Sequence, residues 1–157
     1  MSPTTCRRIA LCVTLALACG PAALGVRGQQ PEFKTEYYNG KVRPLAELLD
    51  KQGAKLDADA AAHWMALVSD DGKIYPLVKD DGARMFFKDK ALLNRPMRLK
   101  AKLIPGSQLL QVVNVYSNIQ GKLHEVYYWC DICSIRRQEA GTCECCGAPM
   151  VLKEEPK

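Results

Sequence analysis

Apolar and basic residues alternate strictly from position 97 to position 103. Alternation with period two predicts a β-strand that packs one face against a core and exposes the other face to water. The apolar face comprises Met97, Leu99, Ala101 and Leu103, and the basic face comprises Arg98, Lys100 and Lys102. We interpret the basic face as a solvated surface, because it carries no aromatic side chain on which a nucleic acid base could stack.

Short apolar runs elsewhere in the chain predict further strands separated by turns. Asp71-Gly72 is a strong hairpin signal between two of these runs. Pro76 places the returning strand at a sheet edge, because proline cannot donate to a hydrogen-bonded ladder. The predicted strands cover residues 40–43, 64–68, 73–78, 97–103, 109–116 and 122–129.

Short helices are indicated between the strands. Pro44 suits the first turn of a helix over residues 44–52. Asp89 can cap a second helix over residues 90–94, and one helical turn can begin at Asp57. The predicted fold class is therefore mainly β (α+β), with one or two short helices and a small five-stranded sheet or barrel. The number and order of the strands resemble an OB-fold.

The N-terminus resembles an export signal. Arg7 and Arg8 precede an apolar run over residues 9–18, which is too short to span a bilayer as a permanent helix. One small-residue cleavage site ends at Gly25, and a second candidate ends at Gly28. We therefore expect an exported protein, periplasmic or extracellular.

Cys19 follows small residues in a pattern that resembles a lipoprotein acylation site, so a lipid anchor at Cys19 is an alternative to a freely exported protein.

The expected organisation has four parts. They are a signal peptide (residues 1–25), a linker (26–39), an OB-like β-domain (40–129), and a four-cysteine zinc-ribbon-like element with the tail (130–157).

The net charge gives no reason to expect a nucleic acid partner. The full chain carries a formal charge of +5. Removing residues 1–25 removes two arginines and no acid, which leaves 20 basic and 17 acidic residues and a charge of +3. One Zn²⁺ held by four thiolates would subtract about two more. A nearly neutral protein lacks the electrostatic footprint of nucleic-acid-binding proteins.

Four of the eight cysteines form two C-x2-C pairs near the C-terminus. A nine-residue spacer separates Cys130 and Cys133 from Cys143 and Cys146, and this spacing is typical of a tetrahedral zinc site. A site whose four ligands are all thiolates leaves no position for a water molecule, so its expected role is structural. We predict zinc at this site, with iron as the alternative.

The tail has little other means of ordering itself. Its large apolar side chains are few, and so short a segment cannot bury enough surface to fold alone. Zinc binding contributes roughly 10–16 kcal/mol in isolated zinc-finger peptides, so we expect the metal to replace a hydrophobic core. The large apolar residues of the tail are Ile132, Ile135, Met150, Val151 and Leu152.

Cys145 is the fifth cysteine that remains once the leader is removed. It can be a spare thiol, a substitute ligand for Cys143 or Cys146, or a reactive thiol whose pKa Arg136 or Arg137 lowers. Four metal ligands and one spare thiol account most simply for the odd number of cysteines. Two disulfides with one free thiol, or a redox-active pair, are the alternatives.

Residues 128–150 resemble the paired knuckles of zinc ribbons and rubredoxins. The second knuckle, CECCG, fits the C-x-x-C-G pattern, whereas the first, CDICS, has Ser134 where glycine is usual. Residues 71–147 also resemble a family of exported bacterial proteins of unknown function, through the segments DGKIYPL, RPM, YYWCDIC and CECCG. This resemblance implies export and metal binding but no particular activity.

No catalytic arrangement can be recognised in the sequence, whether a Ser/His/Asp set, a carboxylate dyad or a phosphate-binding glycine loop. His124 could supply a nitrogen ligand, but we interpret it as a surface residue of a strand. We therefore expect a non-enzymatic exported module that binds a structural metal and contacts a protein partner. The alternative is a redox protein, either a rubredoxin-like iron carrier or a thiol–disulfide exchanger using Cys130 and Cys133. Metal delivery assisted by Cys145 is a third hypothesis.

Overall fold

The structure of the chain is a computed structural model that describes residues 33–157. The predicted signal peptide (residues 1–25) and the first part of the predicted linker lie outside the described residues. None of the helices in the described part is long and apolar enough to cross a membrane.

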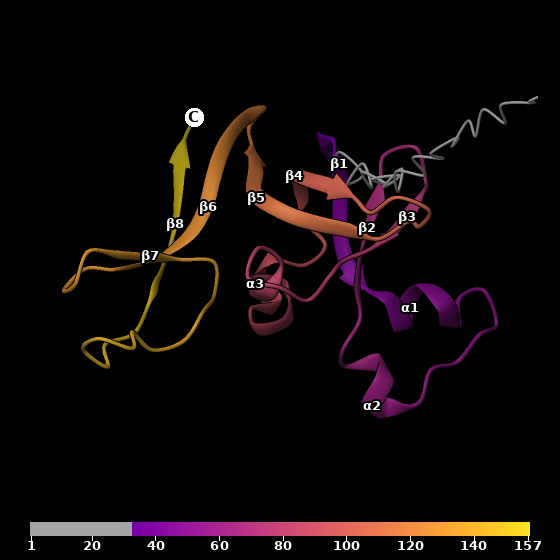
Figure 1. Cartoon of the computed structure of the whole chain (residues 1–157), viewed down its shortest axis with the longest axis horizontal. Helices are drawn as coiled ribbons and strands as arrows, with labels where there is room; N and C mark the ends of the chain where they lie inside the picture. Colours follow the sequence, from indigo (N-terminus) through magenta and orange to yellow (C-terminus); the bar gives the residue numbers. More distant parts are fainter. Residues whose placement is uncertain (1–32) are drawn as a thin grey trace, which may run out of the picture. The chain divides into compact units, whose positions relative to one another are not determined.

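An antiparallel sheet of eight strands dominates the described residues (Figure 1). The strands are β1 (Thr35–Pro44), β2 (Met65–Ser69), β3 (Ile74–Pro76), β4 (Pro96–Leu103), β5 (Leu110–Ile119), β6 (Lys122–Cys130), β7 (Ile135–Arg137) and β8 (Val151–Pro156). They follow the order β3-β2-β1-β4-β5-β6-β7, and β8 pairs with β6. Residues 35–41 of β1 pair with β4 and residues 40–44 pair with β2, so β1 joins the β2–β3 hairpin to the strands from β4 onward.

The alternating segment forms β4 as predicted. Met97, Leu99 and Ala101 are buried, and the basic residues between them lie half-buried on the opposite face. Leu103 is exposed, so the buried row ends at Ala101, one apolar residue earlier than the pattern indicates.

The predicted mainly-β class is confirmed, but the sheet does not close into a barrel. β3 and β7 lie at the two ends of the strand path. An isolated parallel bridge between Leu77 and Leu110 joins the segment after β3 to the start of β5, and the Val78 N–H donates to the Leu110 carbonyl at 2.9 Å. A single bridge replaces the continuous ladder that a closed barrel requires.

Two of the short helices begin where the sequence indicates. α1 (Leu45–Asp50) follows Pro44 directly, in agreement with the helix predicted over residues 44–52. Asp57 caps α2 (Ala58–Ala61), because its side chain accepts a hydrogen bond from a backbone N–H three residues further on. Such a cap satisfies one of the N–H groups that a helix start leaves without an intrahelical partner.

The segment before β4 differs in part from the prediction. The helix expected over residues 90–94 is a shorter 3₁₀ turn, η1 (Lys90–Leu92), capped by Asp89 as predicted. Immediately before it lies α3 (Arg84–Lys88), to which the sequence analysis assigned no element. A five-residue helix is too short for its apolar periodicity to be recognised.

The core lies where α3 packs against the inner face of the sheet. Met85 and Phe86 of α3 are almost completely buried. Figure 1 shows α3 between β6 on one side and β1 and β2 on the other. Cys130 and Cys143 belong to the same apolar cluster. The core therefore continues from the sheet into the cysteine-rich segment. Other fully buried members are Val42, Leu67, Leu77, Leu92, Leu99, Leu110, Val115 and Val126.

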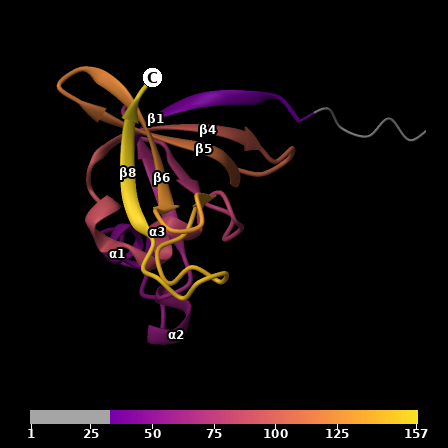
Figure 2. The same cartoon turned by 90° about the vertical axis from the view of Figure 1, so that its left-hand side faces the viewer.

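Strand β6 is paired along both of its edges (Figure 2). On one edge residues 122–125 pair with β5 and residues 128–130 pair with β7, while residues 124–129 pair with β8 on the other edge. The sequence analysis did not predict β8, because its lysine and glutamates are residues that strands disfavour. β6 thus delivers Cys130 and holds the two segments that flank the remaining cysteines.

Tyr128 connects β6 to the segment after α3. Its hydroxyl donates to Asp89 Oδ2 at 2.6 Å, while Asp89 Oδ1 accepts from the Ala91 N–H at 2.8 Å. Burial, followed by the hydrogen bond to Asp89, raises the pKa of Tyr128 above its ordinary value. The hydroxyl therefore remains a donor at neutral pH.

We expect Tyr128→Phe to lower the free energy of unfolding by about 1.5–3 kcal/mol, because it removes a hydrogen bond to a charged acceptor and leaves a partly buried carboxylate short of a donor. Tyr75→Phe is the matched control, since the Tyr75 hydroxyl has no side-chain hydrogen bond within residues 33–157. Its expected effect is below about 0.5 kcal/mol. Urea unfolding of the metal-loaded proteins measures both, and equal effects would contradict the role given to Asp89.

Candidate metal centre

The first knuckle (residues 130–134) begins at the last residue of β6. The Ser134 N–H donates to the Cys130 carbonyl at 2.8 Å, and the Cys133 N–H donates to Cys130 Sγ at 3.4 Å. Ser134 has a φ of 55°, in the left-handed region where glycine is usual. The first knuckle therefore adopts the turn of the C-x-x-C-G pattern although it lacks the glycine.

The second knuckle (residues 143–147) repeats this geometry. The Gly147 N–H donates to the Cys143 carbonyl at 2.8 Å, and Gly147 has a φ of 74°. Hydrogen bonds from the backbone N–H groups of Cys146 and Cys145 lower the pKa of Cys143 to about 7. In both knuckles, backbone donors face the sulfur of the first cysteine, an arrangement that favours a thiolate there.

The two knuckles bring together the four cysteines that the sequence analysis selected as ligands. The Sγ atoms of Cys130, Cys133, Cys143 and Cys146 all lie within 4.8 Å of one another, and those of Cys130 and Cys146 are 3.5 Å apart. Sulfurs around a tetrahedral zinc ion at 2.3 Å are about 3.8 Å apart. Four soft thiolate donors at this separation fit a zinc or iron ion, and small side-chain movements would equalise the distances.

Burial divides the cluster into two halves. The first cysteine of each knuckle is buried, with Cys130 0% and Cys143 2% exposed. The second cysteine of each knuckle is nearer the surface, Cys133 half-buried and Cys146 exposed. An ion held by all four sulfurs would therefore lie at the border between the core and the solvent.

The thiols of the cluster crowd one another. Interactions with the neighbouring side chains of Cys145 and Cys146, in which the Cys133 thiol is the donor, raise the pKa of Cys133 above its ordinary value, and burial acts in the same direction. The pKa of Cys130 is also raised, because burial and the neighbouring thiols outweigh the N–H of Cys133, which acts in the opposite direction. A bound divalent cation reverses this balance, because its charge stabilises all four thiolates.

Cys145 lies outside the group of four, on the exposed side. None of the five cysteines in the described part forms a disulfide. The group of four contains both Cys143 and Cys146, so Cys145 takes the place of neither. A spare thiol beside the cluster is therefore the interpretation that the geometry favours.

His124, Arg136 and Arg137 do not belong to the group of four ligands, although Arg137 lines a pocket together with Cys143 and Cys145. His124 Nδ1 is 3.2 Å from the Lys122 carbonyl and does not belong to the cluster. Arg136 donates to Glu125 at 2.5 Å, and Arg137 pairs with Glu144 at 2.7 Å. Both arginines are thus engaged by carboxylates.

Glu139 fastens the segment between β7 and the second knuckle to α3. Its carboxylate accepts hydrogen bonds from Lys88 and, at 2.9 Å, from Arg84 Nη1. Lys88 and then Arg84 hold the pKa of Glu139 below its ordinary value. The sequence carries no signal of this contact, because Glu139 lies more than 50 residues from Arg84 and Lys88 and no local pattern connects them.

No protein-family model matches this sequence, and neither a curated protein nor a solved structure is significantly similar to it. The resemblance to exported bacterial proteins gains no support from these comparisons and stays a prediction. The fold and the cysteines define the class: a mainly-β protein with a four-thiol cluster that can hold a metal ion.

We expect Ser134→Gly to raise the free energy of unfolding of the metal-loaded protein by up to about 1 kcal/mol. Glycine removes the left-handed backbone penalty of roughly 1–2 kcal/mol, and its extra freedom in the unfolded chain offsets part of this gain. Ser134→Ala is the control and should show no increase. A lower stability for Ser134→Gly than for Ser134→Ala would contradict the proposed turn.

The pKa of Glu139 is depressed in the folded protein, so its contribution to stability is present above the unfolded pKa of about 4.3 and is lost as the pH falls through the folded pKa. We expect Glu139→Gln to lower the Tm at neutral pH. The difference from the unchanged protein should narrow at acidic pH. Differential scanning calorimetry with saturating zinc measures the Tm of both proteins at each pH. Protonation of the thiolates at acidic pH affects both proteins alike, so the difference in Tm reports on Glu139.

Glu144→Gln is the matched control for this measurement. Glu144 pairs with Arg137, but its side chain is 80% exposed, and such pairs contribute little to stability. A change in Tm as large for Glu144→Gln as for Glu139→Gln would contradict the role assigned to Glu139.

Proposed function

We propose that this protein is a non-enzymatic, exported module that binds one structural zinc ion through Cys130, Cys133, Cys143 and Cys146. The observation that carries the proposal is the gathering of four Sγ atoms within 4.8 Å by two knuckles of the same backbone geometry. Four protein ligands complete a tetrahedral shell, so such a centre has no position at which zinc could activate a water molecule.

The stabilising role of the ion follows from what surrounds it. Three of the five large apolar residues of the tail remain exposed, namely Ile132, Ile135 and Val151. They contribute little buried surface to the loops that carry the knuckles, so a metal that joins the four sulfurs supplies the missing constraint. The metal serves the fold of these loops rather than a reaction.

A protein partner is supported by the same exposed residues. Ile132, at the tip of the first knuckle, is 72% exposed, and Ile135 lies close by at 38%. Large aliphatic side chains held on a rigid turn suit contact with an apolar patch on another protein. The knuckle surface is therefore the proposed site of interaction.

Iron is the alternative occupant, and it would make the protein a redox carrier. The exposure of Cys146 favours this second candidate, because a sulfur ligand at the surface gives an electron partner close access to the ion. The zinc and iron forms share the same four ligands, and they differ in colour and in redox activity.

Elemental analysis and visible absorption of the protein purified from its own host test the proposal. We expect one zinc per chain, no visible band, and about one thiol that reacts rapidly with a thiol reagent. Cys143→Ala should abolish stoichiometric zinc binding, whereas Cys145→Ala is the matched control and should retain it. Iron with visible absorption would favour the redox carrier. Metal-free protein containing disulfides would contradict both functions.

A further inference from the structure

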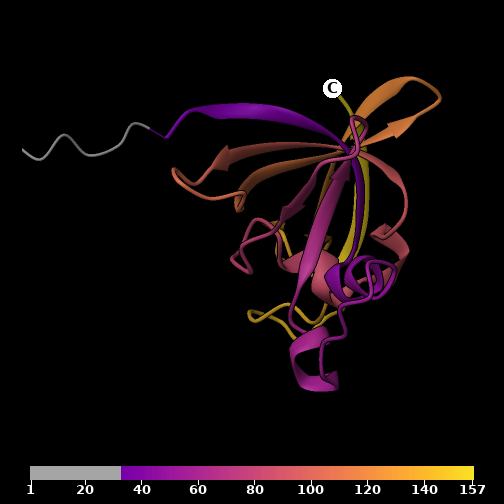
Figure 3. The same cartoon turned by 90° about the vertical axis from the view of Figure 1, so that its right-hand side faces the viewer.

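The face of the sheet that points away from the core carries a row of cations without acidic partners. We call this surface the outer face; it consists of Tyr37, Asn39 and Lys41 of β1, Arg98, Lys100 and Lys102 of β4, Asn114, Tyr116 and Asn118 of β5, and Lys157. The pairing register places Tyr37 opposite Lys100 and Asn39 opposite Arg98. Side chains directly opposite in an antiparallel pair share one face. The three helices lie on the other side of these strands (Figures 1 and 3).

Elsewhere in the described residues, most long cationic side chains are neutralised. Between residues 33 and 157, every arginine except Arg98 has a carboxylate within ion-pair distance. Arg98 instead donates to the Asn39 side chain at 2.6 Å. Lys41, Lys100 and Lys102 likewise have no carboxylate within 4.0 Å in the described part. The positive charge of the outer face is thus left available to a ligand.

An aromatic ring lies among these cations. The Tyr37 side chain is 52% exposed, with Arg98 at 6.0 Å and Lys157 at 5.9 Å from its ring centroid. Tyr116 is buried beneath Lys157, so it does not offer a second free ring. A single exposed ring can stack on one unit of a ligand but cannot provide the successive platforms that single-stranded nucleic acids use.

Side-chain amides are interspersed with the cations. Asn39 lies opposite Arg98 and Asn114 lies opposite Lys100, and Asn118 follows further along β5, opposite Leu123. An amide offers both donors and an acceptor, which are what a hydroxyl group needs. The combination of amides, cations and one ring therefore matches a ligand that carries hydroxyls, anionic groups and an apolar ring face.

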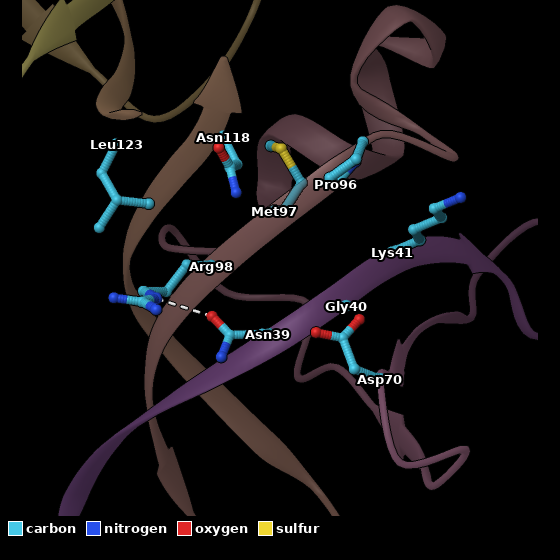
Figure 4. Close-up of a pocket in the computed structure, with 9 residues that line it drawn as sticks. All are labelled: Asn39, Gly40, Lys41, Asp70, Pro96, Met97, Arg98, Asn118 and Leu123. Carbon is cyan, nitrogen blue, oxygen red and sulfur yellow. Dashed lines mark hydrogen bonds between the residues drawn. The ribbon is translucent and has the colours of Figure 1, made fainter. Parts of the chain in front are cut away.

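A pocket of about 350 Å³ lies at one end of the outer face (Figure 4). Figure 4 shows Leu123, Asn118 and Arg98 with its bonded partner Asn39 at one side of it, and Lys41 and Asp70 at the other. Asn118 has no side-chain hydrogen bond in the part of the chain that the structure describes. The pocket thus combines free donors with one carboxylate acceptor.

We infer that the outer face binds a linear acidic polysaccharide. Its carboxylates would lie against Lys100, Lys102 and Arg98, one sugar ring would stack on Tyr37, and a neighbouring sugar would enter the pocket with its hydroxyls bonded to Asn118 and Asp70. Attraction to this row is electrostatic, and it therefore weakens as salt screens the charges.

Polygalacturonate is the probe for this proposal, and neutral dextran of similar length is the reference ligand. We expect the zinc-loaded protein to bind polygalacturonate at low salt, less tightly at high salt, and not to bind dextran. The combined variant Arg98→Gln/Lys100→Gln/Lys102→Gln should weaken binding about tenfold or more. Tyr37→Ala leaves the charge unchanged and should also weaken the binding of polygalacturonate. Attraction between charges alone would predict no effect of this variant.

The matched control is Lys51→Gln/Lys55→Gln/Lys90→Gln, which removes the same charge from exposed lysines outside this surface. We expect it to bind like the unchanged protein, and all variants to keep their zinc and their Tm. Equal loss in the control, an unaffected Tyr37→Ala variant, equal binding of dextran, or no binding at low salt would overturn the proposal. Tighter binding of poly(dT) at the same salt would overturn it in favour of a nucleic acid. None of these outcomes bears on the zinc centre, which the variants leave intact.

Discussion

Pairing of β6 along both of its edges is the constraint on which the C-terminal part of the protein depends. The ladder with β8 joins six residue pairs, from His124 with Pro156 to Trp129 with Val151. The loops between β6 and β8 have the short β7, one isolated bridge between Thr142 and Pro149, and the contact of Glu139 with α3. The backbone ladder therefore fixes both ends of the tail. A metal ion held by the four cysteines would constrain the loops in between, rather than the whole tail as the sequence alone suggests.

The position of the sulfurs shows how a metal would act on these loops. Cys130 and Cys143 belong to the same apolar cluster as Phe86 and Leu99, so one half of the site is held by the core. Cys133 is half-buried and packs against the edge of this cluster, whereas Cys146 is exposed. A metal would transmit the rigidity of the buried half to the exposed half. Loss of the metal would release Cys146 first.

What could be predicted from the sequence follows the range of the interactions. The ligand set depends on two C-x2-C turns, which are local, and the strand at β4 depends on an alternation within a few residues. The capping role of Asp89 is equally local, but its hydrogen bond to Tyr128 joins residues far apart in the chain and left no signal. The sequence does not decide whether the sheet closes into a barrel. Closure depends on how the segment at Leu77 meets Leu110 of β5, and the number of strands does not determine that contact.

Glu125 links the outer face to β7, the strand that follows the first knuckle. This residue lies opposite Tyr116 on the neighbouring strand, at the border of the cationic row. Arg136, and more weakly Asn114, hold the pKa of Glu125 below its ordinary value, so the carboxylate stays ionised.

Arg136 neutralises that charge from β7 and covers the Tyr127 ring at 4.1 Å. Because β7 begins directly after the first knuckle, the turn that holds the sulfurs also places Arg136. A metal that fixes this turn would thereby keep Glu125 paired and preserve the positive potential of the outer face.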